Sequence, residues 1–407
     1  MTTARPLAEV IETARLWEPH INAFAALGGT PIDQPHSGAL SGLSVGIKDV
    51  IDVAGLPTRN GSDACRDALP AARDAPVVAA LRHAGARIIG KTTTTEFAFT
   101  DPTACRNPHD LNRSPGGSSS GSGAAVAASV VDIALGTQTA GSLCRPAAYC
   151  GVVGFKPSHG VLSTVGVTPL APSFDSVGII AGSVALARAA FRAMAPSADA
   201  IPHDNAKTAH IGCWTSDIVP IPDTLDAMRD ASNAMSDSRL SPTSGDLNAN
   251  VDRIVTAHRT VMNFEAAAAH GAILKDERVH RLQPKFLAGL RAGAMTSPKQ
   301  AKEAAAFLTT AKQAFWRDKI GVDIILTLPV PEGAPLIDGT TGYQDWLTPW
   351  TVFGGPLVCL PWGMDTLGRP RSIMLAAHPG MDAQLLAVAA QIEDRSPPIV
   401  RPQKPSF

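Results

Sequence analysis

Three segments of the sequence carry side chains that suit nucleophilic attack by a serine. Lys48 stands among the apolar residues of GLSVGIKDVIDVAG, PGGSSSGSG spans residues 115–123, and the turn TQTAGS ends at Ser142. A serine hydroxyl attacks well only when a base takes its proton, and none of these segments contains a histidine. The candidate base is Lys48, which can act near neutral pH only if burial keeps its amine uncharged.

Each of these features also has an ordinary structural explanation when it is taken alone. Lys48 could be a strand-end lysine beside Asp49, and Ser142 could be a loop hydroxyl or a helix N-cap. The turn from Thr139 to Ser142 nevertheless consists of small residues, which leave backbone N–H groups unshielded. Unshielded N–H groups are what an oxyanion hole requires, so this turn suits stabilisation of a tetrahedral intermediate.

Two short motifs fit known patterns in their letters but not in their context. GARIIGKT, residues 85–92, fits the phosphate-loop pattern with Lys91, yet a predicted helix ends at Gly85 and the supposed loop letters form a predicted strand. GSSSG, residues 117–121, fits a nucleophile elbow centred on Ser119, although the polar, proline-broken PHDLNRSPG precedes it instead of a buried strand. Both interpretations are therefore weak.

The three segments together resemble the amidase signature family. GIKD, PGGSSSGSGAAVAA and GTQTAGSLCRPAAYCGVVGFKPS occur in the family's order and approximate separation, and the similarity runs from about residue 38 to 185. It returns more loosely at VDIILTLPVP and WTVFGGPLVCLP. The resemblance implies a large mixed β-sheet surrounded by α-helices, an α/β fold, and no cofactor or metal.

The resemblance also implies a Ser-Ser-Lys triad and an acyl-enzyme intermediate. Ser142 matches the nucleophile, Ser118 the bridging serine that follows a cis peptide, and Lys48 the base. A hydroxyl donates and accepts, so Ser118 can pass a proton between the other two. The oxyanion hole is expected from the backbone N–H groups of Thr139, Ala140 and Gly141. The family usually has glycine where this chain has Ala140, which would be strained if that residue needs a positive φ.

Three further residues are candidates for substrate binding or for orienting the site. A malonamidase-like short branch of the family has an arginine near Arg145 that contacts a substrate carboxylate, although a structural ion pair explains Arg145 equally well. Gln138 is expected to orient the nucleophile turn, and Ser119 to tune Ser118 or to cap the following helix. Asp175 also fits a family position, with a structural role.

Composition excludes several classes of protein. The chain has 407 residues, a net charge of −1, 45% hydrophobic and 17% charged residues, which argues against nucleic-acid binding. Its longest apolar runs are shorter than the roughly 20 residues of a membrane span. Six scattered cysteines without CxxC spacing and a start without a secretory h-region favour a cytoplasmic protein. The expected partner is a small-molecule amide, without nucleic acid or membrane, and a homodimer is left open.

Hydrophobic periodicity predicts the elements that must position these residues. A helix over residues 6–27 precedes alternating strands and helices, including a helix in APVVAALRHAG, a strand in ARIIGKT, and an Ala-rich helix followed by a buried strand in GAAVAASVVDIALG. VDIILTLPVP, PLVCLPWG and RSIMLAAH predict later strands. We expect one amidase domain over 1–407, with its catalytic core at about 38–190 and 320–395, a helical layer or cap at about 222–320, and a proline-rich tail at 394–407.

Four functions are consistent with the sequence. The favoured one is a free-standing amidase of a small amide. The second is a relative that acts on carbamates, ureas or aryl amides, and the third is the glutaminase subunit of a tRNA-dependent amidotransferase. The fourth, from a different class, is a phosphate-loop nucleotide-binding protein that uses Lys91.

Overall fold

The strands form one mixed sheet that runs through the molecule. The computed structural model describes residues 4–28, 37–199, 211–215, 220–236, 243–246, 251–318 and 321–405. Within these ranges the sheet has 11 strands in the order β1-β3-β2-β4-β6-β5-β10-β11-β9-β7-β8. The strands are β1 Phe24–Leu27, β2 Ser44–Lys48, β3 Arg87–Thr92, β4 Ile133–Gln138, β5 Val153–Lys156, β6 Ser176–Ala181, β7 Ile211–Thr215, β8 Thr243–Asp246, β9 Ile324–Thr327, β10 Leu357–Met364 and β11 Pro370–Ala377.

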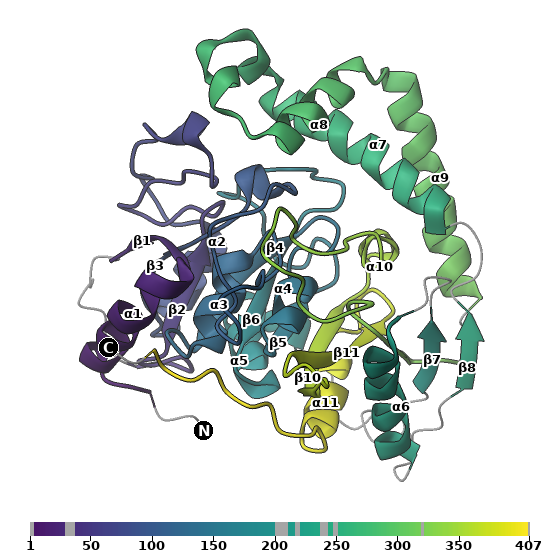
Figure 1. The fold of residues 1–407 in the computed structure, drawn as a ribbon. Helices are drawn as coiled ribbons and strands as arrows, with labels where there is room; N and C mark the ends of the chain where they lie inside the picture. The colour runs from purple at the N-terminus through teal and green to yellow at the C-terminus, as the bar shows by residue number, and fades with distance from the viewer. Residues whose placement is uncertain are drawn as a thin grey trace.

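Helices pack around this sheet, and three of them extend beyond it. The α-helices are α1 Leu7–Ile21, α2 Pro76–His83, α3 Ser120–Ala127, α4 Cys144–Tyr149, α5 Val184–Met194, α6 Pro222–Ser236, α7 Val251–His270, α8 Pro284–Met295, α9 Pro298–Arg317, α10 Thr348–Phe353 and α11 Asp382–Glu393. Figure 1 shows α7, α8 and α9 as an arc beside the body that contains the sheet. None of the helices in the described ranges is long and apolar enough to cross a membrane.

Parallel strands bring the candidate catalytic segments to one edge of the sheet. β2 lies between β3 and β4 and runs parallel to both. All residues of β2 and β4 are buried, as expected of strands covered on both faces. The carboxyl end of β2 carries Lys48, and the carboxyl end of β4 leads into the turn with Ser142. Side chains that leave parallel strands at their carboxyl ends meet in one region.

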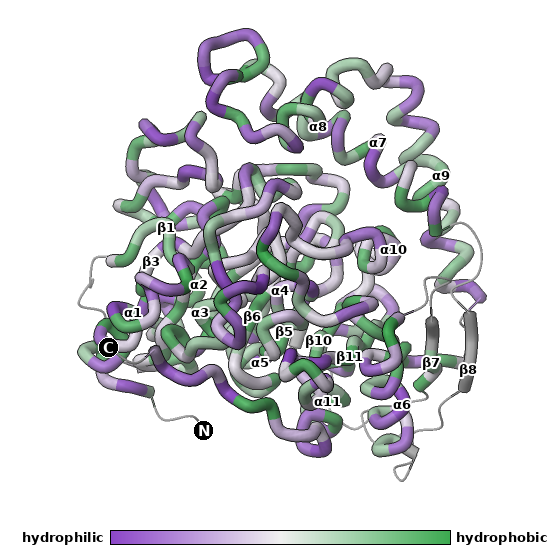
Figure 2. Tube along the Cα trace, viewed as in Figure 1, coloured by the Kyte–Doolittle hydropathy of each residue, from purple (hydrophilic) through white to green (hydrophobic). Residues whose placement is uncertain are grey.

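The hydropathy of the residues matches their positions in the fold. Figure 2 shows hydrophobic positions along the central strands, whereas α7 and α9 alternate between hydrophobic and hydrophilic positions. On α7 the buried residues recur at spacings of three and four and face the rest of the protein, as an amphipathic surface helix does. The buried set on this helix includes one histidine, His258.

Most of the predicted elements are present, but the end of the first helix differs and the predicted helical region contains a strand. The predicted strand in ARIIGKT is β3, and the predicted strands in VDIILTLPVP, PLVCLPWG and RSIMLAAH are β9, β10 and β11. The first helix ends at Ile21 instead of continuing toward residue 27, because Asn22 adopts a left-handed conformation, and Phe24–Leu27 pairs with β3. The region 222–320 contains the strand β8 among its helices. The tail from 394 to 405 has no helix or strand.

Candidate active site

Lys48 contacts two hydroxyl groups at the carboxyl end of β2. Ile47 is paired with Leu135 of the parallel strand β4, so Lys48 lies beside the last residues of that strand. Its Nζ donates to Ser118 Oγ at 2.6 Å and to Thr137 Oγ1 at 2.7 Å. The predicted base and the predicted bridging serine are therefore in direct contact, and Thr137 is a second partner of the amine.

The surroundings of Lys48 favour its uncharged form. Lys48 is fully buried, and no carboxylate of the described residues lies within ion-pair distance of its amine. Burial lowers the pKa of Lys48 well below its usual value, and the more distant charge of Asp175 opposes this effect. Desolvation penalises an ammonium group more than a neutral amine. An amine kept neutral in this way has a lone pair available to accept a proton.

Ser118 is placed by the glycine pair that precedes it. The peptide bond between Gly117 and Ser118 is cis, as the family resemblance implies. Gly116 has a φ of +82°, and a Cβ at Gly117 would come within 3 Å of the side chains of Thr341 and Thr95. A larger residue at either position would be strained or would clash. The glycines thus allow the close packing that brings the Ser118 hydroxyl to Lys48.

Ser142 lies in the turn between β4 and α4, next to the serine-rich segment. The backbone N–H of Ser119 donates to the carbonyl of Ser142 at 3.1 Å, which joins the two segments. The Ser142 side chain is 7% exposed, and its hydroxyl makes no hydrogen bond to any residue that the structure describes. The Ser142 hydroxyl is therefore buried and free of hydrogen bonds to described residues, whereas the Ser118 hydroxyl accepts a hydrogen bond from Lys48.

The N–H groups of the turn are available as hydrogen-bond donors. In the described part of the chain, the backbone N–H groups of Ala140, Gly141 and Ser142 have no acceptor. Ala140 is not among the residues with a positive φ, so alanine causes no left-handed strain at this position. The predicted oxyanion hole comprised Thr139, Ala140 and Gly141. The N–H of Thr139 likewise has no acceptor among the described residues, and the N–H of Ser142 is a further free donor.

Gln138 and Ser119 support the turn from within the protein. Gln138 Oε1 accepts from the N–H groups of Leu143 and Cys144, both at 3.0 Å. Gln138 thus contacts the two residues that directly follow Ser142, and its orienting role stays a prediction. The Ser119 hydroxyl lies 3.3 Å from both the N–H and the carbonyl of Thr137. Ser119 is fully buried and no sheet strand directly precedes it, which also argues against the nucleophile elbow.

Arg145 contacts the peptide that carries Ser118. Its Nη2 donates to the Gly117 carbonyl at 2.6 Å, and the side chain is 1% exposed. Burial lowers the pKa of Arg145 to about 10. Its weaker hydrogen bonds go to the Gly342 carbonyl at 3.4 Å and to Thr341 Oγ1 at 3.5 Å. The guanidinium thus holds backbone oxygens in this structure, and no ion pair to a carboxylate is formed by it among the described residues.

Three contributors to the site were missed from the sequence. Thr137 binds Lys48, His258 Nε2 lies 2.8 Å from the Thr139 carbonyl, and Thr351 Oγ1 donates to the Ala140 carbonyl. Thr137 lies two residues before Thr139, on β4, whose residues are all buried. His258 occupies the apolar stripe of α7, where a histidine stands out as a buried polar residue in need of a partner.

Asp175, predicted to be structural, braces the same turn. One of its carboxylate oxygens accepts from the Thr139 hydroxyl at 2.6 Å. The other accepts from the N–H groups of Leu170 and Ala171, at 2.8 and 3.0 Å. Burial raises the pKa of Asp175, and these hydrogen bonds oppose that rise. Asp175 therefore connects the turn to the loop that precedes β6.

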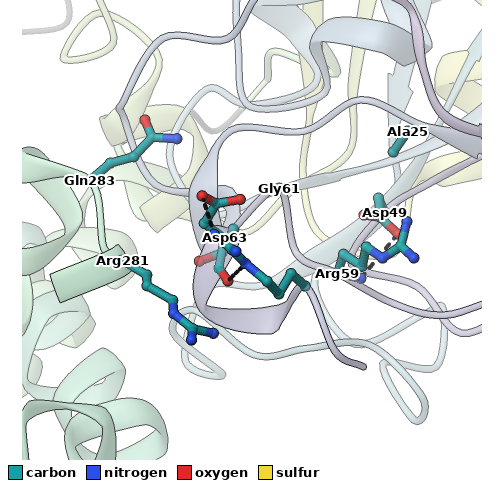
Figure 3. Close-up of a pocket in the computed structure, with 9 residues that line it drawn as sticks. Ala25, Asp49, Arg59, Gly61, Asp63, Arg281 and Gln283 are labelled. Carbon is teal, nitrogen blue, oxygen red and sulfur yellow. Dashed lines mark hydrogen bonds and ion pairs between the residues drawn. The ribbon is translucent and has the colours of Figure 1, made fainter. Parts of the chain in front are cut away.

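The phosphate-loop interpretation is wrong. Lys91 lies on strand β3 and is buried, and its Nζ forms an ion pair with Asp49 Oδ1 at 2.9 Å. Asp49 lines a pocket of about 580 Å³, shown in Figure 3, whose other lining residues include arginines and a second aspartate. A phosphate loop needs a flexible glycine-rich turn whose N–H groups face the ligand, and a hydrogen-bonded strand cannot supply it.

Neither metal nor thiol chemistry is indicated by the described residues. They contain no group of three or more His, Cys, Asp or Glu side chains arranged to hold a metal ion. Burial raises the pKa of the Cys144 thiol, two residues after Ser142, to about 12. A thiol nucleophile must be ionised, so Cys144 is a core residue and not a second nucleophile.

Solved structures share this architecture. A crystal structure of an amidase superposes with a TM-score of 0.83 over 96% of this chain and 95% of its own length, at 28% identity. A chain from a vestigial protein complex that reveals the origins of an s-triazine catabolic enzyme gives a TM-score of 0.84 at 26% identity, over 95% of this chain and 94% of its own. The fold is that of the amidase signature enzymes.

Sequence comparison places the chain within that class. The model of the family described as Amidase matches residues 23–386, so the chain belongs to the amidase family. Amidase 1 from Arabidopsis thaliana is 48% identical over 154 residues, which are 36% of each chain. One subunit of the glutamyl-tRNA(Gln) amidotransferase of Anaeromyxobacter sp. (strain K) is 46% identical over 162 residues, 38% of this chain and 33% of that protein. The chain thus spans about a third of the length of the curated relatives it matches.

Proposed function

We propose that this protein hydrolyses the C–N bond of a small-molecule amide, with Ser142 as nucleophile, Ser118 as proton bridge and Lys48 as base. The contact between Lys48 Nζ and Ser118 Oγ at 2.6 Å, in a fully buried setting, is the observation that carries the proposal. It supplies a neutral amine next to a hydroxyl that can relay a proton. The chain's membership of the amidase family supports the same reaction.

The proposed first half of the reaction forms an acyl-enzyme. The Ser142 hydroxyl attacks the amide carbon and its proton passes through Ser118 to Lys48. The oxygen of the tetrahedral intermediate accepts from the free N–H groups of the turn, whose expected members are Thr139, Ala140 and Gly141. The C–N bond then breaks, and the proton returns through Ser118 to the departing nitrogen, so that ammonia or an amine leaves.

The second half regenerates the enzyme. Water attacks the acyl-enzyme carbonyl and gives its proton through Ser118 to Lys48. The same N–H groups hold the second oxyanion, the bond to Ser142 Oγ breaks, and the proton returns to that oxygen. A carboxylic acid is released.

A second candidate function is a glutaminase that supplies ammonia to a partner. The amidotransferase relatives favour it, since one of them shares 46% identity with this chain over 162 residues. The two proposals predict the same catalytic residues and differ in substrate. Glutamine hydrolysis that depends on added partner subunits would select the second, and turnover of small amides by the chain alone would select the first.

Substitution of the proposed triad tests the mechanism. The assay compares Ser142→Ala, Ser118→Ala and Lys48→Ala on a panel of small amides, carbamates, ureas and glutamine. We expect Ser142→Ala to lose turnover by several orders of magnitude and the other two to be severely impaired. Ser122→Ala is the matched control, since Ser122 Oγ donates to the Leu135 carbonyl instead of contacting Lys48. Full turnover by Ser142→Ala together with an inactive Ser119→Ala would overturn the assignment.

A further inference from the structure

Each of the four carbonyl groups of the turn 139–142 accepts a hydrogen bond. The carbonyl of Gly141 accepts from the N–H of Arg145, and that of Ser142 from the N–H of Ser119, both at 3.1 Å. The carbonyls of Thr139 and Ala140 accept from side chains instead, as described below. In a trans peptide the C=O and the following N–H point in opposite directions. Fixing each carbonyl therefore fixes the direction of the next N–H.

His258 holds the first of these peptides from the helical layer. It lies on α7, is 3% exposed, and its Nε2 is 2.8 Å from the Thr139 carbonyl. Burial lowers the pKa of His258 to about 4, so the ring is neutral near pH 7. Since a carbonyl only accepts, the single ring proton must be on Nε2. The N–H of Ala140 then points away from His258.

Phe174 keeps the His258 ring in place. The centres of the two rings are 4.3 Å apart, and the rings are tilted by 38°. Phe174 directly precedes Asp175, whose carboxylate accepts from the Thr139 hydroxyl. The Thr139 residue is thus fixed by its side chain and by its carbonyl, through two contacts that come from different segments.

Thr351 holds the second peptide from α10. Its hydroxyl donates to the Ala140 carbonyl and accepts from Gln138 Nε2, the latter at 3.0 Å. The amide N–H₂ of Gln138 can only donate, so the one hydroxyl proton of Thr351 goes to Ala140. Gln138 Oε1 is already occupied by two backbone N–H groups, which fixes the orientation of its amide. The N–H of Gly141 consequently points away from Thr351.

We propose that His258 and Thr351 are positioning residues that hold the oxyanion-binding N–H groups of Ala140 and Gly141 in their working direction. The inference rests on the proposed function, because it assigns these N–H groups to the oxyanion hole. His258 lies outside the stretches that resemble the family, whereas Thr351 lies in WTVFGGPLVCLP, where the resemblance is looser. The helical layer that provides α7 therefore contributes to transition-state stabilisation, in addition to any contact it makes with substrate.

A phosphonylation rate measures the oxyanion hole without knowledge of the natural substrate. An alkyl fluorophosphonate reacts with an activated serine: the Ser142 Oγ–P bond forms, the P–F bond breaks, fluoride leaves, and the hydroxyl proton passes through Ser118 to Lys48. Negative charge develops on the phosphoryl oxygen in the position of the amide oxyanion. The label is located by mass spectrometry, and the second-order rate constant is compared between variants.

Two matched pairs of variants test the proposal. His258→Leu and Thr351→Val remove the donors, whereas His258→Gln and Thr351→Ser retain a donor near the same position. We expect the first pair to label roughly 10²-fold more slowly, as expected for misplaced catalytic groups, and the second pair to recover most of the rate. On an amide that the wild type hydrolyses, the loss should appear in kcat with little change in KM. Thermal unfolding of each variant shows whether it remains folded.

The outcomes separate this inference from the proposed function. Equal labelling rates in folded His258→Leu and the wild type, or equally slow His258→Gln and His258→Leu, would overturn the role of His258. If His258→Leu does not fold, the Thr351 pair decides the proposal in the same way. A wild type that labels at Ser142 and hydrolyses amides keeps the proposed function whatever the variants do. A wild type that does neither overturns the proposed function and this inference with it.

Discussion

Lys48 Nζ lies 2.6 Å from Ser118 Oγ, and solvent reaches neither residue. Burial lowers the pKa of the Lys48 amine well below its usual value, and no counter-ion of the described residues lies close enough to offset this fully. The amine can accept a proton only while it is neutral. This pair therefore determines how the proposed reaction should depend on pH.

We expect the kcat/KM of the wild type to fall on the acid side. As pH decreases through the lowered pKa of Lys48, the amine becomes protonated and can no longer act as a base. The acid limb of the kcat/KM profile should have the slope expected when a single group is protonated. Lys48→Arg, whose side chain stays protonated, should be inactive at every pH. Activity that stays constant as the pH falls until the protein unfolds would contradict the role of Lys48.

Asp175→Asn should move this acid limb to lower pH. Burial lowers the pKa of Lys48, and the negative charge of Asp175 raises it. Removing the Asp175 charge should therefore lower the pKa of Lys48 further. The pH profile of kcat/KM measures the shift. Asp382→Asn is the matched control, because Asp382 is also a buried aspartate that accepts from Ser158 but does not influence Lys48. A limb that moves to higher pH in Asp175→Asn would refute the argument.

Thr137→Val should reduce kcat several-fold to about tenfold. The substitution preserves the shape of the side chain but removes the acceptor that Lys48 Nζ contacts at 2.7 Å. A hydrogen bond of this kind contributes about 1 kcal/mol net, and its loss frees the amine to turn away from Ser118. Thr137→Ser retains the hydroxyl and should recover most of the rate. If Val and Ser variants turn over equally, the hydroxyl of Thr137 does not orient the base.

Arg145→Met separates two roles for this residue. If Arg145 acts by holding the Gly117 carbonyl, the variant should have a lower kcat. Its free energy of unfolding should also fall by about 1–3 kcal/mol, because a buried acceptor loses its partner. Amides with and without a carboxylate should then be affected alike. A selective rise in KM for carboxylate-bearing amides would instead support the malonamidase-like contact. Steady-state kinetics on matched substrate pairs and chemical denaturation provide the two measurements.

The sequence by itself determined the catalytic candidates and the central strands. Lys48, Ser118 and Ser142 were identified because serines without a histidine need another base, and because the three motifs resemble those of one family. The strands ARIIGKT and RSIMLAAH were predicted because short apolar runs are bounded by glycine and proline. These features depend on residue type and local spacing, which can be read along the chain.

Only the tertiary structure decided which side chains support the site. Thr137 meets Lys48 because β2 and β4 are parallel neighbours, and His258 meets Thr139 because α7 packs over the turn, 119 residues further along the chain. Arg145 was left between two roles by the sequence, and its contact with the Gly117 carbonyl depends on how α4 packs against the segment that carries Ser118. Hydrogen bonds between distant segments leave no periodicity in a single sequence. The packing of the sheet and the helical layer therefore had to supply them.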